Sequence, residues 1–115
     1  MERIVERGML FDIYGELLTN HQQSVYLDLV ESDMSLSEIA DKHGITRQGA
    51  HDLIKRCDKI LSDYESKLGL LGRFLKMQGQ IDELRQLADS LPSDGESGRV
   101  GIRIREILDS MEEEI

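Results

Sequence analysis

The chain has 115 residues, a net charge of −9 and a single cysteine, Cys57. This length suits one domain, and a lone cysteine excludes an internal disulfide framework and a zinc site built on thiolates. No apolar run approaches the roughly 18 residues that span a membrane, and the N-terminal MERIVERGML lacks the features of a signal peptide. Few aromatic residues, one Pro and many Leu, Glu, Lys and Arg favour helices, so we expect a soluble, cytoplasmic, all-α protein.

The first two predicted helices come from apolar residues repeated every three to four positions. One helix covers about residues 2–18, and the second ends near residues 31–33. Thr19 and Gln22 have the spacing of a capping box, in which each side chain satisfies a free backbone amide of the other residue. The second helix should therefore begin just after Thr19.

The next two helices are also marked by capping residues. Ser35 and Glu38 form another capping-box pattern, which opens a short third helix over 36–43. Thr46 is a suitable N-cap for a fourth helix, which we expect to continue as far as residue 68. These two helices are separated by a few residues only.

The C-terminal half contains two apolar stripes and a loop. The stripes of residues 64–75 and 77–91 differ in phase, and glycines weaken the region, so one kinked helix or two helices fit equally. Residues 92–98 are expected to form a loop because they hold the only Pro and several turn-forming residues. A last helix follows over about 99–114. We expect residues 1–115 to form a single helical domain.

The most informative stretch is residues 36–55, LSEIADKHGITRQGAHDLIK, which predicts a helix-turn-helix. Two helices that cross steeply need a small residue at their contact, supplied by Ala40, and a residue that can turn the chain, supplied by Gly44. Four apolar residues in register with these then point into a shared core: Ile39, Ile45, Ala50 and Leu53. In such a unit the second helix enters the DNA major groove, so we expect nucleic-acid binding.

The open face of the second helix carries the candidate nucleic-acid-binding residues: Thr46, Arg47, Gln48, His51, Lys55, Arg56 and Lys59. An arginine can bond guanine and a glutamine adenine, while threonine and the later basic residues suit phosphates. Asp52 is unfavourable beside phosphates unless it pairs with Arg56 or accepts from a cytosine. Residues 46–61 hold four basic and two acidic residues, whereas residues 1–45 have a net charge of −6.

Two resemblances rest on these motifs. Residues 20–61, NHQQSVYLDLVESDMSLSEIADKHGITRQGAHDLIKRCDKIL, resemble region 4 of bacterial sigma factors. Residues 1–91 more closely resemble the YlxM family of small bacterial helix-turn-helix proteins. The closer resemblance is carried by LFDIYGELLTNHQQ, by SLSEIADKHGITRQGAHDLIKRC and by the following LSDYESKLGLL.

The resemblance implies an all-α fold with a sigma-like helix-turn-helix. It also implies a role beside the signal recognition particle, because genes of this family accompany that of the particle's GTPase. Similarity to the sigma factors places Arg47, Gln48 and His51 on the base-reading face. The acid content of residues 1–45 is high for a DNA-docking surface, and residues 92–115 carry no family motif.

Other functions and an assembly state stay open. The acidic surface fits a protein-interaction module that docks on the particle's GTPase or its RNA without binding DNA, and a further alternative is recognition of the particle's RNA in place of DNA. The apolar stripes after residue 64 are buried either within the domain or in a two-fold homodimer. The three His residues are scattered, Cys57 falls on an apolar stripe, and no catalytic motif is present. We therefore expect no enzyme activity, no metal site and no cofactor.

Overall fold

The computed structural model describes residues 2–115, and within that range the regular structure is entirely helical. The chain divides into two compact units, of which the first ends at Leu71 and the second is Gly72–Ile115. The all-α fold class predicted from composition is confirmed; the expectation of a single domain stays a prediction. In chain order the elements are α1 (Arg3–Tyr14), the 3-10 turn η1 (Gly15–Leu17), α2 (Asn20–Val30), α3 (Leu36–His43), α4 (Arg47–Leu68), α5 (Leu70–Asp89) and α6 (Gly95–Glu114).

Both predicted capping boxes are present in the first unit. Thr19 Oγ1 accepts a hydrogen bond from the Gln22 amide, and the Gln22 side chain accepts from the Thr19 amide at 3.0 Å. Ser35 and Glu38 exchange the same pair of bonds at the start of α3. These reciprocal bonds satisfy amides that have no partner within the helix, and they fix where α2 and α3 begin.

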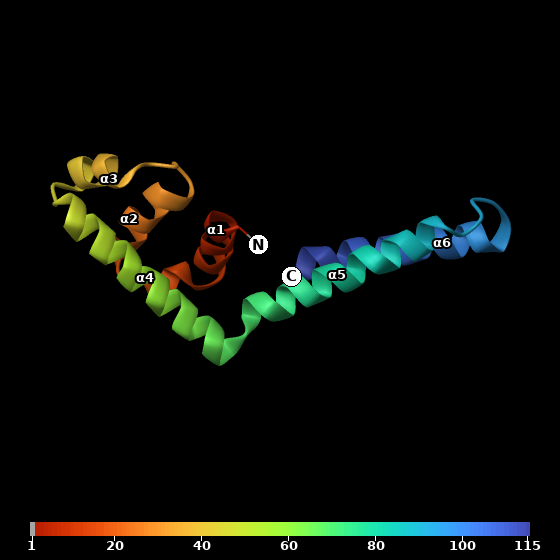
Figure 1. The fold of residues 1–115 in the computed structure, drawn as a ribbon. Coiled ribbons are helices and arrows are strands. Elements are labelled where there is room, and N and C mark those ends of the chain that lie inside the picture. The colour runs from red at the N-terminus through yellow and green to blue at the C-terminus, as the bar shows by residue number, and fades with distance from the viewer. Residues whose placement is uncertain (1) are drawn as a thin grey trace. The chain divides into compact units, whose positions relative to one another are not determined.

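The helix-turn-helix consists of α3, a short turn and the first half of α4 (Figure 1). Gly44 ends α3 in the left-handed conformation, with φ of +66°, and the following Ile45 amide donates to the Ala40 carbonyl at 3.0 Å. Ala40 and Ala50 are buried where the two helices pack. The turn is therefore short because a glycine permits it and a small residue lets the helices approach.

A buried core holds the four α-helices of the first unit around α4. Its aromatic members are Tyr14 and Tyr26, each at most 1% exposed, and Phe11 stacks on Tyr26 at a ring-centroid distance of 5.8 Å. The other buried apolar residues of this unit are Leu10, Leu18, Val25, Ile39, Ala40, Ala50, Ile54, Cys57, Leu61 and Leu71. Cys57 is thus a core residue, as its place on the apolar stripe predicted, and burial raises the pKa of its thiol to about 11.

Helices α4 and α5 are separated at Gly69, which resolves the two alternatives for residues 64–91 in favour of two helices. Gly69 has φ of +64° and ends α4. The first amides of α5 are satisfied from elsewhere in the unit: Leu70 donates to Tyr14 Oη at 3.1 Å and Leu71 to Glu65 Oε1 at 2.9 Å. The later change of phase within α5 does not break it. It follows from a change of packing partner, because Leu71 lies in the core of the first unit whereas Ile81 faces α6.

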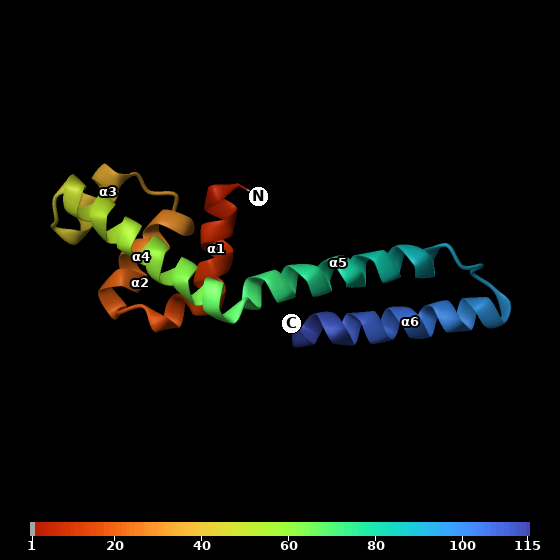
Figure 2. The ribbon, with the colours of Figure 1, turned by 60° about the horizontal axis from the view of Figure 1, so that its bottom comes forward.

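The second unit is an antiparallel hairpin of α5 and α6, which lie side by side in Figures 1 and 2. Its small core is Ile81, Ala88 and Leu108, with Gly98 and Gly101 buried near the hairpin loop. Helix α6 begins at Gly95, earlier than the expected start at residue 99, with Asp94 in the N-cap position. Residues that favour turns also favour the first turn of a helix, so the end of the loop could not be separated from the start of α6 by composition.

Replacing Gly98 by alanine is expected to destabilise the hairpin by about 1–3 kcal/mol. A Cβ at residue 98 would lie 2.5 Å from the Ser93 carbonyl oxygen, so backbone must move. Gly79→Ala is the matched control, since residue 79 is exposed in the middle of α5 and a Cβ there has no neighbour within 4 Å. This change should raise stability by about 0.5–1 kcal/mol. Urea unfolding followed by circular dichroism measures both, and an equal effect of the two changes would contradict the close packing at Gly98.

Candidate nucleic-acid interface

The seven candidate residues begin at the N-cap of α4 and occupy its first three turns. Successive residues of a helix are offset by about 100°, so residues four, seven and eleven apart share one side. Gln48, Lys55 and Lys59 therefore form one exposed stripe, together with Asp52. Arg47 and the half-exposed His51 form a second stripe beside the first, and Arg56 lies at the far edge. The structure thus divides the predicted face into adjacent stripes.

Thr46 stands at the N-terminal end of these stripes. It is the N-cap of α4, and its Oγ1 accepts a hydrogen bond from the Gly49 amide at 2.9 Å. Its hydroxyl proton is not used by this bond, and the amides of the first helical turn have no partner within the helix. A helix N-terminus of this kind carries partial positive charge and suits a phosphate oxygen.

Asp52 holds two of the candidate residues in place. Gln48 Nε2 donates to Asp52 Oδ1 at 2.9 Å, and His51 Nδ1 lies 3.5 Å from the same oxygen. The sequence left open whether Asp52 pairs with Arg56; the carboxylate is instead shared between Gln48 and His51. All three side chains are solvent-accessible, so these contacts are weak enough to be exchanged for a ligand.

The basic candidates are mostly available for contact. Within residues 2–115, no ion pair engages Arg47, Lys55 or Arg56, and all three are exposed. Lys59 lies 3.4 Å from Asp63 in an i,i+4 pair whose two side chains are more than half exposed. Exposed pairs of this kind contribute little to stability and are screened by salt. Arg47, Lys55, Arg56 and Lys59 are therefore available to bind a polyanion such as nucleic acid.

Asp58, the second acid of the positive segment, lies eleven residues after Arg47 and so on the same side of α4, but α1 and α2 engage it there. Its carboxylate accepts from Arg7 Nη2 at 2.6 Å and Nε at 3.0 Å, and from Tyr26 Oη at 2.5 Å, while Arg3 lies 3.4 Å away. Burial acts to raise the pKa of Asp58, but the hydrogen bonds from Arg7 and Tyr26 outweigh it and keep that pKa below 3.8. One consequence is structural, since Asp58 ties α1 and α2 to α4. The other is electrostatic: Arg7 neutralises Asp58, so Asp52 is the acid whose charge stays among the candidate residues.

A second inward-facing carboxylate sits beneath α3. Asp28 on α2 is 6% exposed and accepts from Lys42 Nζ at 2.9 Å, and His43 Nε2 lies 2.6 Å from its other oxygen. The hydrogen bond from Lys42 lowers the pKa of Asp28, against the opposing effect of burial. This contact fixes the last turn of α3 to α2, and thereby the orientation of the turn that leads into α4. No local pattern predicts this contact, because its partners are 14 and 15 positions apart.

Acid is expected to unfold the first unit through these two carboxylates. A group whose pKa is lower in the folded state stabilises that state above its unfolded pKa, and this contribution is lost as the pH falls through the folded pKa. Stability should therefore be steady above about pH 5 and fall below about pH 4. Urea unfolding between pH 7 and pH 3 measures this, and Asp28→Asn should lower stability at pH 7 and flatten the acid limb. An unchanged acid limb in that variant would rule out the contribution of Asp28.

Two other kinds of feature, a metal cluster and a membrane-spanning helix, are absent from the part of the chain that the structure describes. Among residues 2–115 no three His, Cys, Asp or Glu side chains lie close enough to hold a metal ion together. None of the helices in that range is long and apolar enough to cross a membrane.

Comparison with known proteins agrees with this architecture. Residues 1–96 match the family model described as "UPF0122: Putative helix-turn-helix protein, YlxM / p13 like". A UPF0122 protein of Clostridium botulinum is 49% identical over 81 residues, covering 70% of this chain and 74% of that protein. Another, from Acetivibrio thermocellus, is 38% identical over 118 residues, covering 96% and 100%. One from Bacillus thuringiensis is 33% identical over 112 residues, covering 97% and 96%.

The family description names a helix-turn-helix protein and no enzymatic activity. It agrees with the resemblance read from the sequence motifs and with the helix pair formed by α3 and the start of α4. The chain belongs to the UPF0122 family of YlxM-like helix-turn-helix proteins.

Proposed function

We propose that this protein is a cytoplasmic, non-enzymatic regulator that binds nucleic acid through the exposed N-terminal half of α4. The observation that carries the proposal is the stripe of Gln48, Lys55 and Lys59, flanked by Arg47 and capped by Thr46. In helix-turn-helix proteins the second helix lies in the major groove and its first residues reach base edges. Arg47 and Gln48 occupy those first positions here.

The charge distribution supports this surface in an otherwise acidic chain. The net charge of −9 repels phosphates at long range, so binding requires a local positive patch. Asp58 and Asp28 are held inside the first unit by Arg7 and by Lys42 with His43, which removes two acids from the solvent-facing surface. Gln48 is released from Asp52 by breaking one exposed hydrogen bond.

The double variant Arg47→Ala, Gln48→Ala should abolish sequence preference and leave the fold intact, because both side chains are exposed and neither enters the core. A duplex selected from a random pool by the wild-type protein supplies the probe. Loss of one good base contact lowers discrimination by about 1–3 kcal/mol, or about 5- to 150-fold. Fluorescence anisotropy at two salt concentrations measures it, with circular dichroism as the folding control. Unchanged affinity and preference would refute the base-reading assignment.

A second candidate function is docking on the signal recognition particle, on its GTPase or its RNA, without DNA binding. The acids on and before α3 favour it, because in a helix-turn-helix the first helix crosses the DNA backbone. Glu31, Asp33, Glu38 and Asp41 are exposed there and would oppose phosphates but attract a basic protein surface. The link to the particle itself rests on the family resemblance.

The two candidates are separated by one comparison. The purified protein is titrated with random duplex DNA, with the particle's RNA, and with that RNA together with its GTPase, each at two salt concentrations. Salt-steep binding to DNA that is weakened by Arg47→Ala supports the first function. Binding to the GTPase assembly that is salt-sensitive yet unaffected by Arg47→Ala supports the second. Preference for the RNA alone, lost on Arg47→Ala, identifies structured RNA as the ligand of the same α4 surface.

A further inference from the structure

The two sides of the α5–α6 hairpin differ in chemistry. On one side, ion pairs connect the helices: Arg85 with Asp109 at 2.8 Å and Glu112 at 3.1 Å, and Arg105 with Asp89 at 3.1 Å. On the other side two cavities are lined mainly by apolar surface, with charged and polar residues at their margins. The exposed apolar residues of this side, which we call the apolar face, are Met77 and Leu84 of α5 and Val100, Ile107, Met111 and Ile115 of α6.

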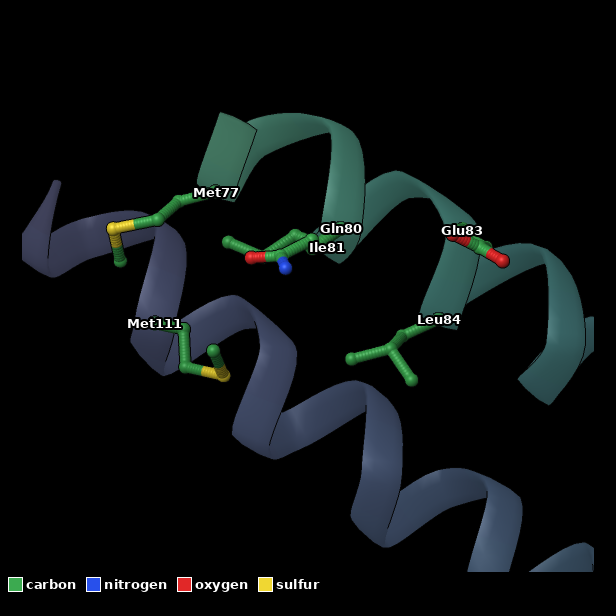
Figure 3. A pocket seen from close by; sticks show the side chains of 6 residues that line it. All are labelled: Met77, Gln80, Ile81, Glu83, Leu84 and Met111. Carbon is green, nitrogen blue, oxygen red and sulfur yellow. The ribbon is translucent and has the colours of Figure 1, made fainter. Parts of the chain in front are cut away.

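The apolar face is hollowed on either side of Met77 and Met111. Met77 and Leu84 reach from α5 toward Met111 of α6, with Ile81 between them, as Figure 3 shows. The cavity they line has a volume of about 330 Å³, and a neighbouring cavity of about 340 Å³ extends from Met77 and Met111 to Ile115. A hairpin of two helices buries only its contact line, so residues that flank this line stay exposed until another layer covers them.

We propose that a second copy of this chain covers the apolar face, so that two hairpins form an antiparallel four-helix bundle about a two-fold axis. The sequence of α6 fits such an axis between residues 107 and 108, with the exposed Ile107 beside it. Antiparallel pairing there places Val100 opposite Ile115 of the second copy, and Ile104 opposite Met111 of the second copy. Both pairs are apolar, and the two-fold repeats each of them.

Charges at the rim of the apolar face match in the same register. Arg103 lies at the edge of the cavity toward the N-terminal half of α6, and Glu114 lies toward its C-terminal end. The same antiparallel pairing brings Arg103, whose ion pair with Glu106 of its own helix is exposed, near Glu114 of the second copy, and the reverse. The acidic C-terminal end opposes the dipole of its own helix, so an arginine from another copy relieves a local repulsion.

The area available reaches the size of the smaller specific dimer interfaces. Helix α6 has 20 residues, so it is about 30 Å long and about 10 Å wide, and two such helices present a face of about 600 Å² before side-chain relief is counted. Specific dimers bury about 800 Å² on each partner. This face is therefore at the lower end of the range for specific dimers, about 600–1,000 Å² on each partner.

Helix α6 offers a matched pair of variants. Ile107 is 45% exposed on the apolar face and Ile102 is 57% exposed. Ile102 lies three residues before Arg105 and seven before Asp109, which places it on the ion-paired side. Ile107→Asp and Ile102→Asp thus make the same change on opposite sides. Light scattering after size exclusion gives the mass of each full-length protein, at loading concentrations up to about 100 µM, where even a micromolar dimer is largely formed.

We expect dimers for the wild-type protein and Ile102→Asp, and a monomer of unchanged helical content for Ile107→Asp. A monomeric wild-type protein, or equal masses for the two variants, would overturn the proposal. Methyl NMR of the wild-type protein decides the matter if Ile107→Asp does not fold. Dilution should shift the signals of Met77 and Met111 and leave those of Met9 and Met34, in the first unit, in place. No shift at Met77 and Met111, or a shift of all four, would equally overturn it.

Discussion

Replacing Asp58 by alanine is expected to lower the free energy of unfolding by about 3 kcal/mol, the largest effect of any single change considered in the first unit. The carboxylate receives three hydrogen bonds of 3.0 Å or less, two from Arg7 and one from Tyr26. Its removal leaves a guanidinium that is 19% exposed without its anion, and a buried phenol without its acceptor. Desolvated groups that lose their partners account for most of the cost of such changes.

Asp63→Ala is the control for this change. It removes the same side chain from the same helix, but Asp63 is 57% exposed and pairs only with Lys59 within residues 2–115. We expect a change within about 0.5 kcal/mol. Urea unfolding at pH 7 gives both values. If Asp58→Ala costs no more than Asp63→Ala, the cluster of Asp58, Arg7 and Tyr26 does not hold α1 and α2 to α4.

Replacing Lys55 and Lys59 together by alanine is expected to weaken nucleic-acid binding by about tenfold at low salt, whatever the sequence of the ligand. Both lysines lie on the exposed stripe beyond the first turn of α4, where side chains contact phosphates and not bases. For each phosphate contact that is lost, binding releases about one counterion fewer. The slope of log affinity against log salt should therefore fall by about two, with sequence preference retained.

Lys67→Ala tests whether this effect is local. Lys67 is exposed on the same helix, eight residues beyond Lys59 and outside the predicted site. It should leave both affinity and salt slope unchanged. Anisotropy titrations at four or so salt concentrations distinguish the variants, and an equal loss for Lys67→Ala would show that the binding reflects general charge and not the stripe on α4.

The local structure of this chain could be predicted because the signals for it are local. Thr19, Ser35 and Thr46 lie next to the helices they cap, and Gly44 lies at the turn it permits, so α3 and the starts of α2 and α4 follow from neighbouring residues. The family is described as a helix-turn-helix family, which agrees with this part of the fold. Spacing alone left one kinked helix or two helices open for residues 64–91; the break lies at Gly69, where Tyr14 and Glu65 accept from the first amides of α5.

The interior contacts that shape the candidate site could not be predicted in the same way. Asp58 and Arg7 are 51 positions apart, and Asp28 is separated from His43 by 15, so no local pattern pairs them. Asp58 counted as one of two acids in the positive segment, although its charge faces Arg7 and not the solvent. The division of the candidate residues into the stripes of Gln48 and of Arg47 does follow from helical periodicity.

Mapping the surface that nucleic acid contacts is the most direct test of the proposed function. Backbone amide signals of the wild-type protein are recorded by NMR while random duplex DNA, and separately structured RNA, is added at low salt. We expect shifts concentrated in residues 46–59, weakening as salt is raised, with residues 72–115 little affected. No shift with either ligand, or shifts that lie outside residues 46–59, would contradict binding through α4.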